Sequence, residues 1–212
     1  MNIECYYQFF FTLLLAYFLG SIPTGYIIGK FKGLDITKEG SGNIGMANVF
    51  RTLGPKYGAL VLILDALKGF IPTYISIKLD FTTLFVLLVG ITSILGHIFT
   101  VFLKFKGGKG VATSLGVVLA ISPILAISSF LVWLTTVIIT RYSSLGSILA
   151  SIWATIIIIL YQFNLINFNL INVNIENKTY LTVFCSIICI FILYKHRENI
   201  KRIINNTENR LF

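Results

Sequence analysis

The sequence has 212 residues, of which 56% are hydrophobic and only 12% are charged. Soluble domains usually carry about 25% charged residues, so this composition and a mean hydropathy of +0.87 exclude an ordinary water-soluble domain. A net charge of +9 would suggest nucleic acid as the partner of a soluble protein, but in a membrane protein it reflects topology. We therefore expect one polytopic membrane domain, residues 1–212, embedded in the lipid bilayer and without a nucleic-acid partner.

The first apolar stretch, residues 7–29, is predicted to be a retained transmembrane helix with its N-terminus outside. A secretory signal begins with basic residues, whereas here only Glu4 precedes the stretch, and Lys30 and Lys32 follow it. No small-residue cleavage site closes the stretch either.

Six further apolar segments follow along the chain, at 58–77, 81–103, 111–122, 124–140, 145–161 and 179–194. Because a helix of about 20 residues crosses the hydrocarbon core, the pattern predicts an all-α integral membrane protein with about seven transmembrane helices. The segment 111–122 is short, and its boundary with the next segment, at Ser122-Pro123, is the least sharply defined.

Basic residues gather in alternate connections. With seven crossings, 14 of the 17 basic residues fall on one side, in the segments 30–57, 104–110 and 141–144 and in the tail from Lys195. The positive-inside rule makes this side, with the C-terminus, cytoplasmic. Asn206 in the tail is then cytoplasmic, and Asn172, in the Asn-rich connection 162–178, is external.

Two charged residues lie inside the second apolar segment. Asp65 and Lys68 are i, i+3 neighbours on a helix, so they can form an ion pair that offsets the cost of placing each charge in the membrane. A structural pair inside the helix bundle is the favoured interpretation, and a catalytic pair is the alternative.

The predicted cytoplasmic connections carry two glycine-rich motifs. GSGNIGMANVFR, residues 40–51, combines glycines with small polar residues and with Arg51, whose planar guanidinium suits phosphate. KFKGGKG, residues 104–110, leads into an apolar helix, so its backbone N–H groups, the helix dipole and Lys109 can together attract an anion. Gly110 stands where a Walker A loop needs Ser or Thr, which disfavours nucleotide hydrolysis. A solvated loop and an ordinary positive-inside loop are the alternatives.

The tail, residues 195–210, is predicted to leave the membrane as a basic helix. His196, Asn199 and Ile203 have i, i+3, i+7 spacing and would share one stripe of that helix. Its basic residues could equally attract anionic lipid headgroups, and His196 alone does not specify a base, a phosphate donor or any function.

Three separated motifs together resemble one known family: GSGNIGMANVFR, GHIFTVFLKFKGGKGVAT at 96–113 and HRENIKRIINNTENR at 196–210. In this order they are similar to the bacterial PlsY family of glycerol-3-phosphate acyltransferases, as are GSIPTGYIIGK at 20–30 and DALKG at 65–69. The resemblance implies seven transmembrane helices with the N-terminus outside. It also implies transfer of a fatty acyl group from acyl phosphate to the 1-hydroxyl of glycerol 3-phosphate, giving lysophosphatidic acid and phosphate for phospholipid synthesis, without metal or cofactor.

The resemblance also implies roles for individual residues. Ser41 and Arg51 would belong to the active site, and His196 and Asn199 would contact the acceptor glycerol phosphate. The loop Gly107, Gly108, Lys109, Gly110 would bind phosphate, and Ser144 and Ser147 would help to hold a phosphate group. The implied enzyme is a monomer in the cell inner membrane, with its active site on the cytoplasmic side.

The sequence departs from the family pattern at three places. Thr100 stands where the family usually has Pro, Met46-Ala47 replaces Ala-Thr, and Asn206 replaces a Gly before Thr207-Glu208. The first two would change loop rigidity, and the third concerns the last turn of the tail.

The residues suit chemistry on an acyl phosphate, because phosphate is already a good leaving group. Binding two phosphates requires several cationic and N–H donors, which also stabilise the developing charge. The proton acceptor stays open between His196, Ser41 and the substrate phosphate.

Three other classes of membrane protein compete with this interpretation. A transporter is disfavoured because the halves show no repeat, and an inactive scaffold would leave the glycines and the His/Asn stripe unexplained. An acyl-CoA-dependent enzyme would carry a His-x4-Asp motif. After His97 and His196, the Asp positions of such a motif are occupied by Phe102 and Lys201.

Overall fold

The protein is described here from a computed structural model that covers residues 3–166 and 178–212. Within these ranges the regular elements are all helices, which confirms the predicted all-α fold. They are α1 (Ile3–Ser21), α2 (Thr24–Phe31), α3 (Met46–Leu53), α4 (Pro55–Lys78), α5 (Thr83–Ile98), the 3₁₀ helix η1 (Val101–Leu103), α6 (Val111–Ile121), α7 (Pro123–Thr140), α8 (Ser143–Gln162), α9 (Lys178–Lys195) and α10 (Arg197–Ile204). Asn172, expected to be external, lies outside the described residues.

Six helical segments of the described chain are long and apolar enough to cross a membrane. They are Tyr6–Phe31, Pro55–Lys78, Thr83–Leu103, Pro123–Thr140, Ser143–Gln162 and Lys178–Lys195. The remaining predicted span, 111–122, forms the 11-residue helix α6. At 1.5 Å per residue α6 is about 16 Å long, roughly half the ~30 Å hydrocarbon core.

The first predicted span is not one continuous helix. α1 ends at Ser21 and α2 begins at Thr24, because Pro23 has no N–H to donate and its ring clashes with the preceding turn. The break exposes two carbonyl groups that a continuous helix would use internally. Lys68 Nζ donates to Ile22 O at 2.7 Å, and the Thr100 hydroxyl donates to Ser21 O.

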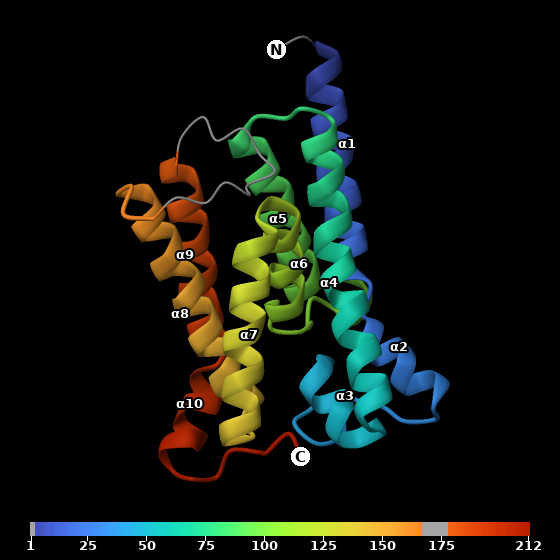
Figure 1. Cartoon of the computed structure of the whole chain (residues 1–212). Coiled ribbons are helices and arrows are strands. Elements are labelled where there is room, and N and C mark those ends of the chain that lie inside the picture. Colours follow the sequence, from blue (N-terminus) through green and yellow to red (C-terminus); the bar gives the residue numbers. More distant parts are fainter. Residues whose placement is uncertain (1–2, 167–177) are drawn as a thin grey trace.

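The long helices form two groups packed side by side. α1, α4, α5 and α6 pack against one another, while α8 packs between α7 and α9. Figure 1 shows α2, α3, α10 and the C-terminus at the end of the bundle opposite the N-terminus. The helix of the first glycine-rich motif, α3, therefore lies at the same end of the bundle as the tail.

Glycine permits the close approach of α4 and α6. A Cβ atom added at Gly69 would overlap the backbone carbonyl of Thr113, and one added at Gly116 would overlap the carbonyl of Ala66. Small residues at such crossings allow membrane helices to pack backbone to backbone. This contact holds the short helix α6 inside the bundle.

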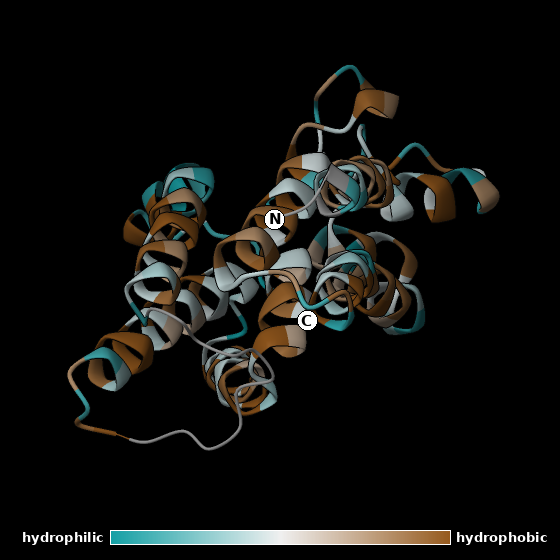
Figure 2. Cartoon of the chain, turned by 90° about the horizontal axis from the view of Figure 1, so that it is seen from above, coloured by the Kyte–Doolittle hydropathy of each residue, from teal (hydrophilic) through white to brown (hydrophobic). Residues whose placement is uncertain are grey.

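A small hydrophobic cluster of Ile36, Val49 and Val61 lies at α3, and the larger core is formed mainly by α5, α6, α7, α8 and α9. Its buried members include Val86, Ile94, Val117, Ile158 and Phe184. Seen from above, the long helices are largely hydrophobic, and hydrophilic residues gather on a few segments (Figure 2). The lipid-facing surface is also apolar, as expected for helices surrounded by hydrocarbon.

The predicted pair of Asp65 and Lys68 is confirmed. Lys68 Nζ lies 2.7 Å from Asp65 Oδ1, and both side chains are buried. The hydroxyl of Thr24 donates to the same carboxylate oxygen. The pair therefore joins α4 to the start of α2.

Membrane sidedness can be tested with single cysteines. In a background with Cys5, Cys185 and Cys189 replaced by Ala, we expect Asn205→Cys in the tail to be protected in intact cells. Leu165→Cys, 70% exposed beyond α8, should react with a membrane-impermeant maleimide. Both positions should react after permeabilisation, and the reverse pattern in intact cells would invert the predicted topology.

Candidate active site

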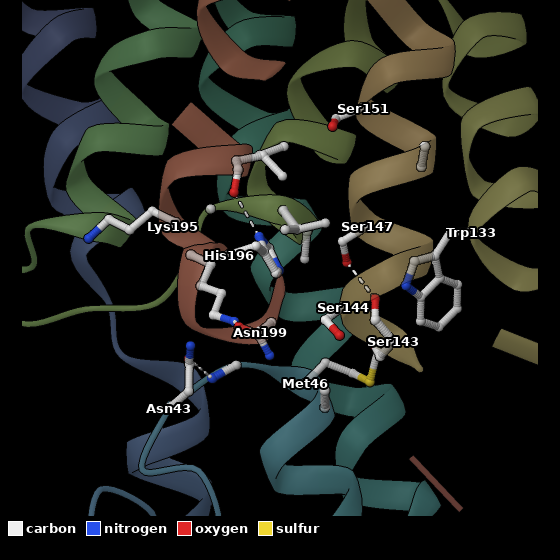
Figure 3. Close-up of a pocket in the computed structure, with 18 of the residues that line it drawn as sticks. Asn43, Met46, Trp133, Ser143, Ser144, Ser147, Ser151, Lys195, His196 and Asn199 are labelled. Atoms are coloured by element: carbon white, nitrogen blue, oxygen red, sulfur yellow. Dashed lines mark hydrogen bonds between the residues drawn. The ribbon is translucent and has the colours of Figure 1, made fainter. Parts of the chain in front are cut away.

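A cavity of about 470 Å³ opens where α3, α6, α8 and α10 meet. Its lining contains most of the residues predicted as site residues: Ser41, Arg51, Lys109, Gly110, Ser144, Ser147, His196 and Asn199. Figure 3 shows His196 and Asn199 on one side of the cavity, the serines of α8 on the other, and Asn43 and Met46 at its edge. The three motifs, far apart in the sequence, thus meet in one place.

The first motif is an ordered loop followed by α3, rather than a flexible connection. Asn48 is 1% exposed, and its side-chain amide donates to the carbonyls of Ile36 and Glu39. Its Oδ1 accepts from the N–H of Ser41 at 2.9 Å. Asn48 therefore fixes the backbone on which Ser41 sits, a role that the sequence analysis did not assign.

Arg51 extends from α3 towards Ser41. Its Nη2 lies 3.4 Å from Ser41 Oγ, which is a weak hydrogen bond. The Nε of Arg51 is buried and has no hydrogen-bond partner among the described residues. A buried donor without a partner is costly, and an anionic ligand in the cavity would satisfy it.

The phosphate-loop prediction needs correction at two glycines. The N–H groups of Gly107 and Gly108 donate to the carbonyls of Ile98 and His97, so neither offers a free amide to an anion. A Cβ at either position would overlap His97. These glycines let the loop pack against α5, a tertiary requirement that spacing alone could not reveal.

The backbone N–H donors that face the cavity belong to the next residues of the chain, at the start of α6. Gly110, at φ +83°, starts α6, and Val111, Ala112 and Ser114 line the cavity after it. The first N–H groups of a helix have no acceptor within that helix, and the positive end of its dipole lies there. The start of α6 and Lys109 therefore present N–H donors and a positive charge to this part of the cavity.

Lys109 crosses the cavity to the tail. Its Nζ donates to Asn199 Oδ1, a contact between residues 90 positions apart. Burial lowers the pKa of Lys109 from its usual 10.5 to about 8, with Arg202 and Arg51 adding to the effect and Glu208 opposing it. Lys109 thus needs an anion nearby to hold its charge fully.

His196 ends α9 and caps α10, and it is 3% exposed. Its Nδ1 lies 2.8 Å from the carbonyl of Ile192, which can only accept, so Nδ1 carries the proton and Nε2 is left with a lone pair. Burial and the charge of Lys109 lower the pKa of His196 to about 4. The imidazole is therefore neutral at pH 7 and offers Nε2 as a hydrogen-bond acceptor.

Glu208 joins the tail to the rest of the site, although the sequence analysis gave it no role. Its carboxylate accepts from Asn199 Nδ2 at 2.6 Å, Ser144 Oγ at 2.8 Å and Arg202 Nε at 2.8 Å. Burial alone raises the pKa of Glu208, but these hydrogen bonds outweigh burial and hold the pKa below its usual value. The carboxylate orients Asn199, which in turn contacts Lys109.

Ser147 is less directly involved, since its hydroxyl donates to the carbonyl of Ser143 within α8 at 2.9 Å. Its oxygen still lines the cavity beside Ser144. Both serines lie in the first turns of α8, where the unpaired backbone N–H groups also favour an anion.

The departures from the family pattern have local explanations. Asn206 takes a left-handed conformation, φ +56°, which suits Gly and which Asn tolerates better than most residues. Its successor Thr207 donates its N–H to Arg202 O, so the turn that presents Glu208 still forms. Thr100, fully buried, donates to Ser21 O and accepts from Phe102 N, so hydrogen bonds hold the segment in place of a Pro ring.

Within the described ranges, no group of three His, Cys, Asp or Glu side chains could hold a metal ion. Function without metal or cofactor stays a prediction.

The sequence model described as "Glycerol-3-phosphate acyltransferase" matches residues 10–206. The chain belongs to the glycerol-3-phosphate acyltransferase family. A relative with that name from Aquifex aeolicus is 45% identical over 94% of this chain and 97% of its own length. A relative from Bacillus subtilis is 42% identical over 94% of this chain and 95% of its own length.

Two solved structures share the fold. A crystal structure of PlsY, an integral membrane glycerol 3-phosphate acyltransferase, in its glycerol 3-phosphate form has a TM-score of 0.84 and 43% identity. Its lysophosphatidic acid form has a TM-score of 0.82 and 43% identity. Each comparison covers 96% of this chain and 95% of the other. This member of the glycerol-3-phosphate acyltransferase family is therefore an integral membrane acyltransferase with several apolar helices.

The role of Glu208 can be tested with Glu208→Gln. The variant loses charge-assisted hydrogen bonds worth about 1.5–3 kcal/mol each, so we expect a melting temperature lower by several degrees and a reduced rate. Thermal unfolding in detergent and initial rates measure the two effects. Glu198→Gln is the matched control, because Glu198 is 58% exposed and its contacts are at the surface. Equal behaviour of the two variants would remove Glu208 from the site's framework.

Proposed function

We propose that this chain transfers a fatty acyl group from acyl phosphate to the 1-hydroxyl of glycerol 3-phosphate, releasing lysophosphatidic acid and phosphate. The observation that carries the proposal is the two-part lining of the cavity. One end holds the cationic side chains, and the other runs between α6, α7 and α8 past Leu115, Val118, Phe130 and Ala154. An acyl phosphate has the same division into an anionic head and an apolar chain.

The polar end suits two phosphate groups near each other. Arg51, Lys109 and Arg202 line it together with Glu208, whose buried carboxylate pairs with Arg202. Burial strengthens the attraction of these cations for an anion, because the screening by water is reduced. The relatives' names and the titles of the two PlsY structures mention glycerol 3-phosphate and lysophosphatidic acid, which supports this acceptor and product.

In the proposed reaction the 1-hydroxyl oxygen attacks the acyl carbonyl carbon. The new ester C–O bond forms, the bond from the acyl carbon to the phosphate oxygen breaks, and phosphate leaves with its electron pair. Lys109 and the N–H groups at the start of α6 stabilise the charge that develops on the carbonyl and phosphate oxygens. The fixed orientation of these donors lowers the barrier without a covalent acyl-enzyme.

The hydroxyl proton must pass to a base. His196 offers a lone pair on Nε2, but its pKa of about 4 makes it a weak base at neutral pH. A phosphate monoester, with a second pKa of about 6, is the stronger proton acceptor. We propose that a substrate phosphate accepts the proton. His196 then orients the attacking hydroxyl group by accepting a hydrogen bond from it.

The other predicted residues take supporting roles in this proposal. Asn199 positions Lys109, and Ser144 and Ser147 offer hydroxyl groups beside the cations. Ser41 contacts Arg51 through its hydroxyl group, and both residues line the cavity. Gly107 and Gly108 shape the phosphate loop, while Gly110 begins the helix whose amides bind the anion.

We place the enzyme in the cell inner membrane, as a monomer, with this cavity on the cytoplasmic side. The basic residues of the connections support the sidedness, because they lie at the end of the bundle that carries α2, α3 and α10. No metal ion or cofactor takes part in the proposed reaction.

Lys109→Ala should lower kcat/KM by about ten- to a hundredfold, because one charge-assisted contact of about 1.5–3 kcal/mol is lost. Lys106→Ala is the control, since Lys106 is exposed on the same loop and has an ordinary negative φ. Lys104 serves less well, because its φ of +52° would also strain Ala. Equal small losses for both variants would limit the lysines to membrane insertion.

The pH dependence of the same reaction gives a second readout of Lys109. As pH rises through about 8, Lys109 in the free enzyme loses its proton and its charge, so kcat/KM should fall. Residual activity of Lys109→Arg should lack this fall, because a guanidinium stays charged. A fall that persists unchanged in Lys109→Arg would assign it to another group.

The acyl donor is the second test. Purified protein should acylate glycerol 3-phosphate from palmitoyl phosphate without added metal or carrier, whereas palmitoyl-CoA and palmitoyl-acyl carrier protein should be inert. The polar end is lined by charged and small polar groups suited to a compact phosphate, and the aromatic residues of the cavity as a whole, Phe130 and Trp133, belong to α7. Initial rates with the three donors, measured side by side in detergent, decide the matter. Thioester turnover as fast as acyl phosphate turnover would overturn this assignment.

A further inference from the structure

The apolar end of the cavity stops at one layer of side chains. Its deepest lining residues along their helices are Val118 on α6, Ser129 on α7 and Ala154 on α8. Ser129 donates its hydroxyl to Leu125 O at 2.7 Å, so the layer presents no free donor to a ligand. Val118 and Ala154 also pack against the hydrophobic core.

A second cavity, of about 10 Å³ and lined mainly by apolar side chains, lies beyond this layer. Its lining residues lie one turn further on: Ser122, just after α6, follows Val118, Leu125 on α7 precedes Ser129, and Ile158 on α8 follows Ala154. Val118 lines both cavities. The two spaces are therefore in line, with Val118 between them.

On the α7 side the first cavity is lined by two aromatic residues. Phe130 stacks on Trp133, with ring centroids 5.5 Å apart and planes at 25°. A Cβ at Gly146 would lie 2.9 Å from Trp133 Cδ1, so this glycine lets α8 pack closely on the indole. An acyl chain in this cavity would have the stacked rings of α7 on one side and α8 on the other.

We propose that Val118, Ser129 and Ala154 form the end of an internal acyl-chain channel and determine the longest chain that this enzyme accepts readily. This inference rests on the proposed acyl-phosphate function. From Ser144 beside the phosphate site to Ala154, α8 rises about 15 Å, which sets the depth available to a chain. A longer chain must displace Val118 to reach the apolar space beyond it.

Two substitutions change the depth in opposite directions. Val118→Ala opens the layer into the second cavity and should move the chain-length optimum towards longer acyl phosphates. The preference should rise by about fourfold for each additional methylene that becomes buried. Ala154→Leu fills the end of the channel and should lower kcat/KM for the longest chains by about tenfold, while the shortest chains keep near-normal rates.

The experiment measures kcat/KM for saturated acyl phosphates from decanoyl to stearoyl phosphate with glycerol 3-phosphate, in detergent. Val183→Ala and Ala59→Leu are matched controls, because both residues are exposed on the outer surface and line neither cavity. They should keep the native chain-length profile. Val118→Ala removes only two methyl groups, so it keeps the test valid if Ala154→Leu fails to fold.

The outcomes separate this inference from the proposed function. Opposite shifts of the profile in Val118→Ala and Ala154→Leu support the channel. Active variants with the native profile would show that the chain leaves sideways into the lipid, and would overturn the channel while the acyl-phosphate reaction stands. Failure of native protein to use an acyl phosphate of any length would overturn the reaction itself, and the channel with it.

Discussion

The arrangement of the site depends on the buried ion pair between Asp65 and Lys68. A charge within an apolar bundle is costly unless it is paired and hydrogen-bonded. Asp65 meets this requirement with Lys68 and Thr24, and Lys68 in turn donates to Ile22 O. The hydroxyl of Ser93 donates to Lys68 O at 2.7 Å. One buried charge pair thus holds α1, α2, α4 and α5 in fixed relative positions.

The glycine-rich loop of residues 104–110 packs directly on this polar layer. His97 Nδ1 lies 3.8 Å from Asp65 Oδ1, and the carbonyls of His97 and Ile98 accept the N–H groups of Gly108 and Gly107. The His97 ring occupies the space that a side chain at Gly108 would need. The end of α5 therefore fixes the position of the loop, and the loop directs Lys109 and the start of α6 towards the cavity.

The cavity joins two environments that a soluble enzyme would keep apart. Its polar end contains a network from Lys109 through Asn199 to Glu208, in which each side chain has a defined partner. Its other end is lined by apolar helix faces. In the proposed reaction, fixed cations next to an apolar lining would let a charged acceptor and a lipid-like donor meet without either leaving its preferred surroundings.

The sequence by itself determined the membrane class and the ion pair of Asp65 and Lys68. These depend on hydropathy, helical spacing and side-chain type, which are local properties of the chain. Only the tertiary structure decided that Pro23 divides the first span and that the N–H groups of Gly107 and Gly108 donate to carbonyls of α5. It also assigned structural roles to Asn48 and Glu208, whose partners come from distant segments. A buried polar group is bound by the atoms that surround it in the folded chain, and a sequence pattern does not contain their positions.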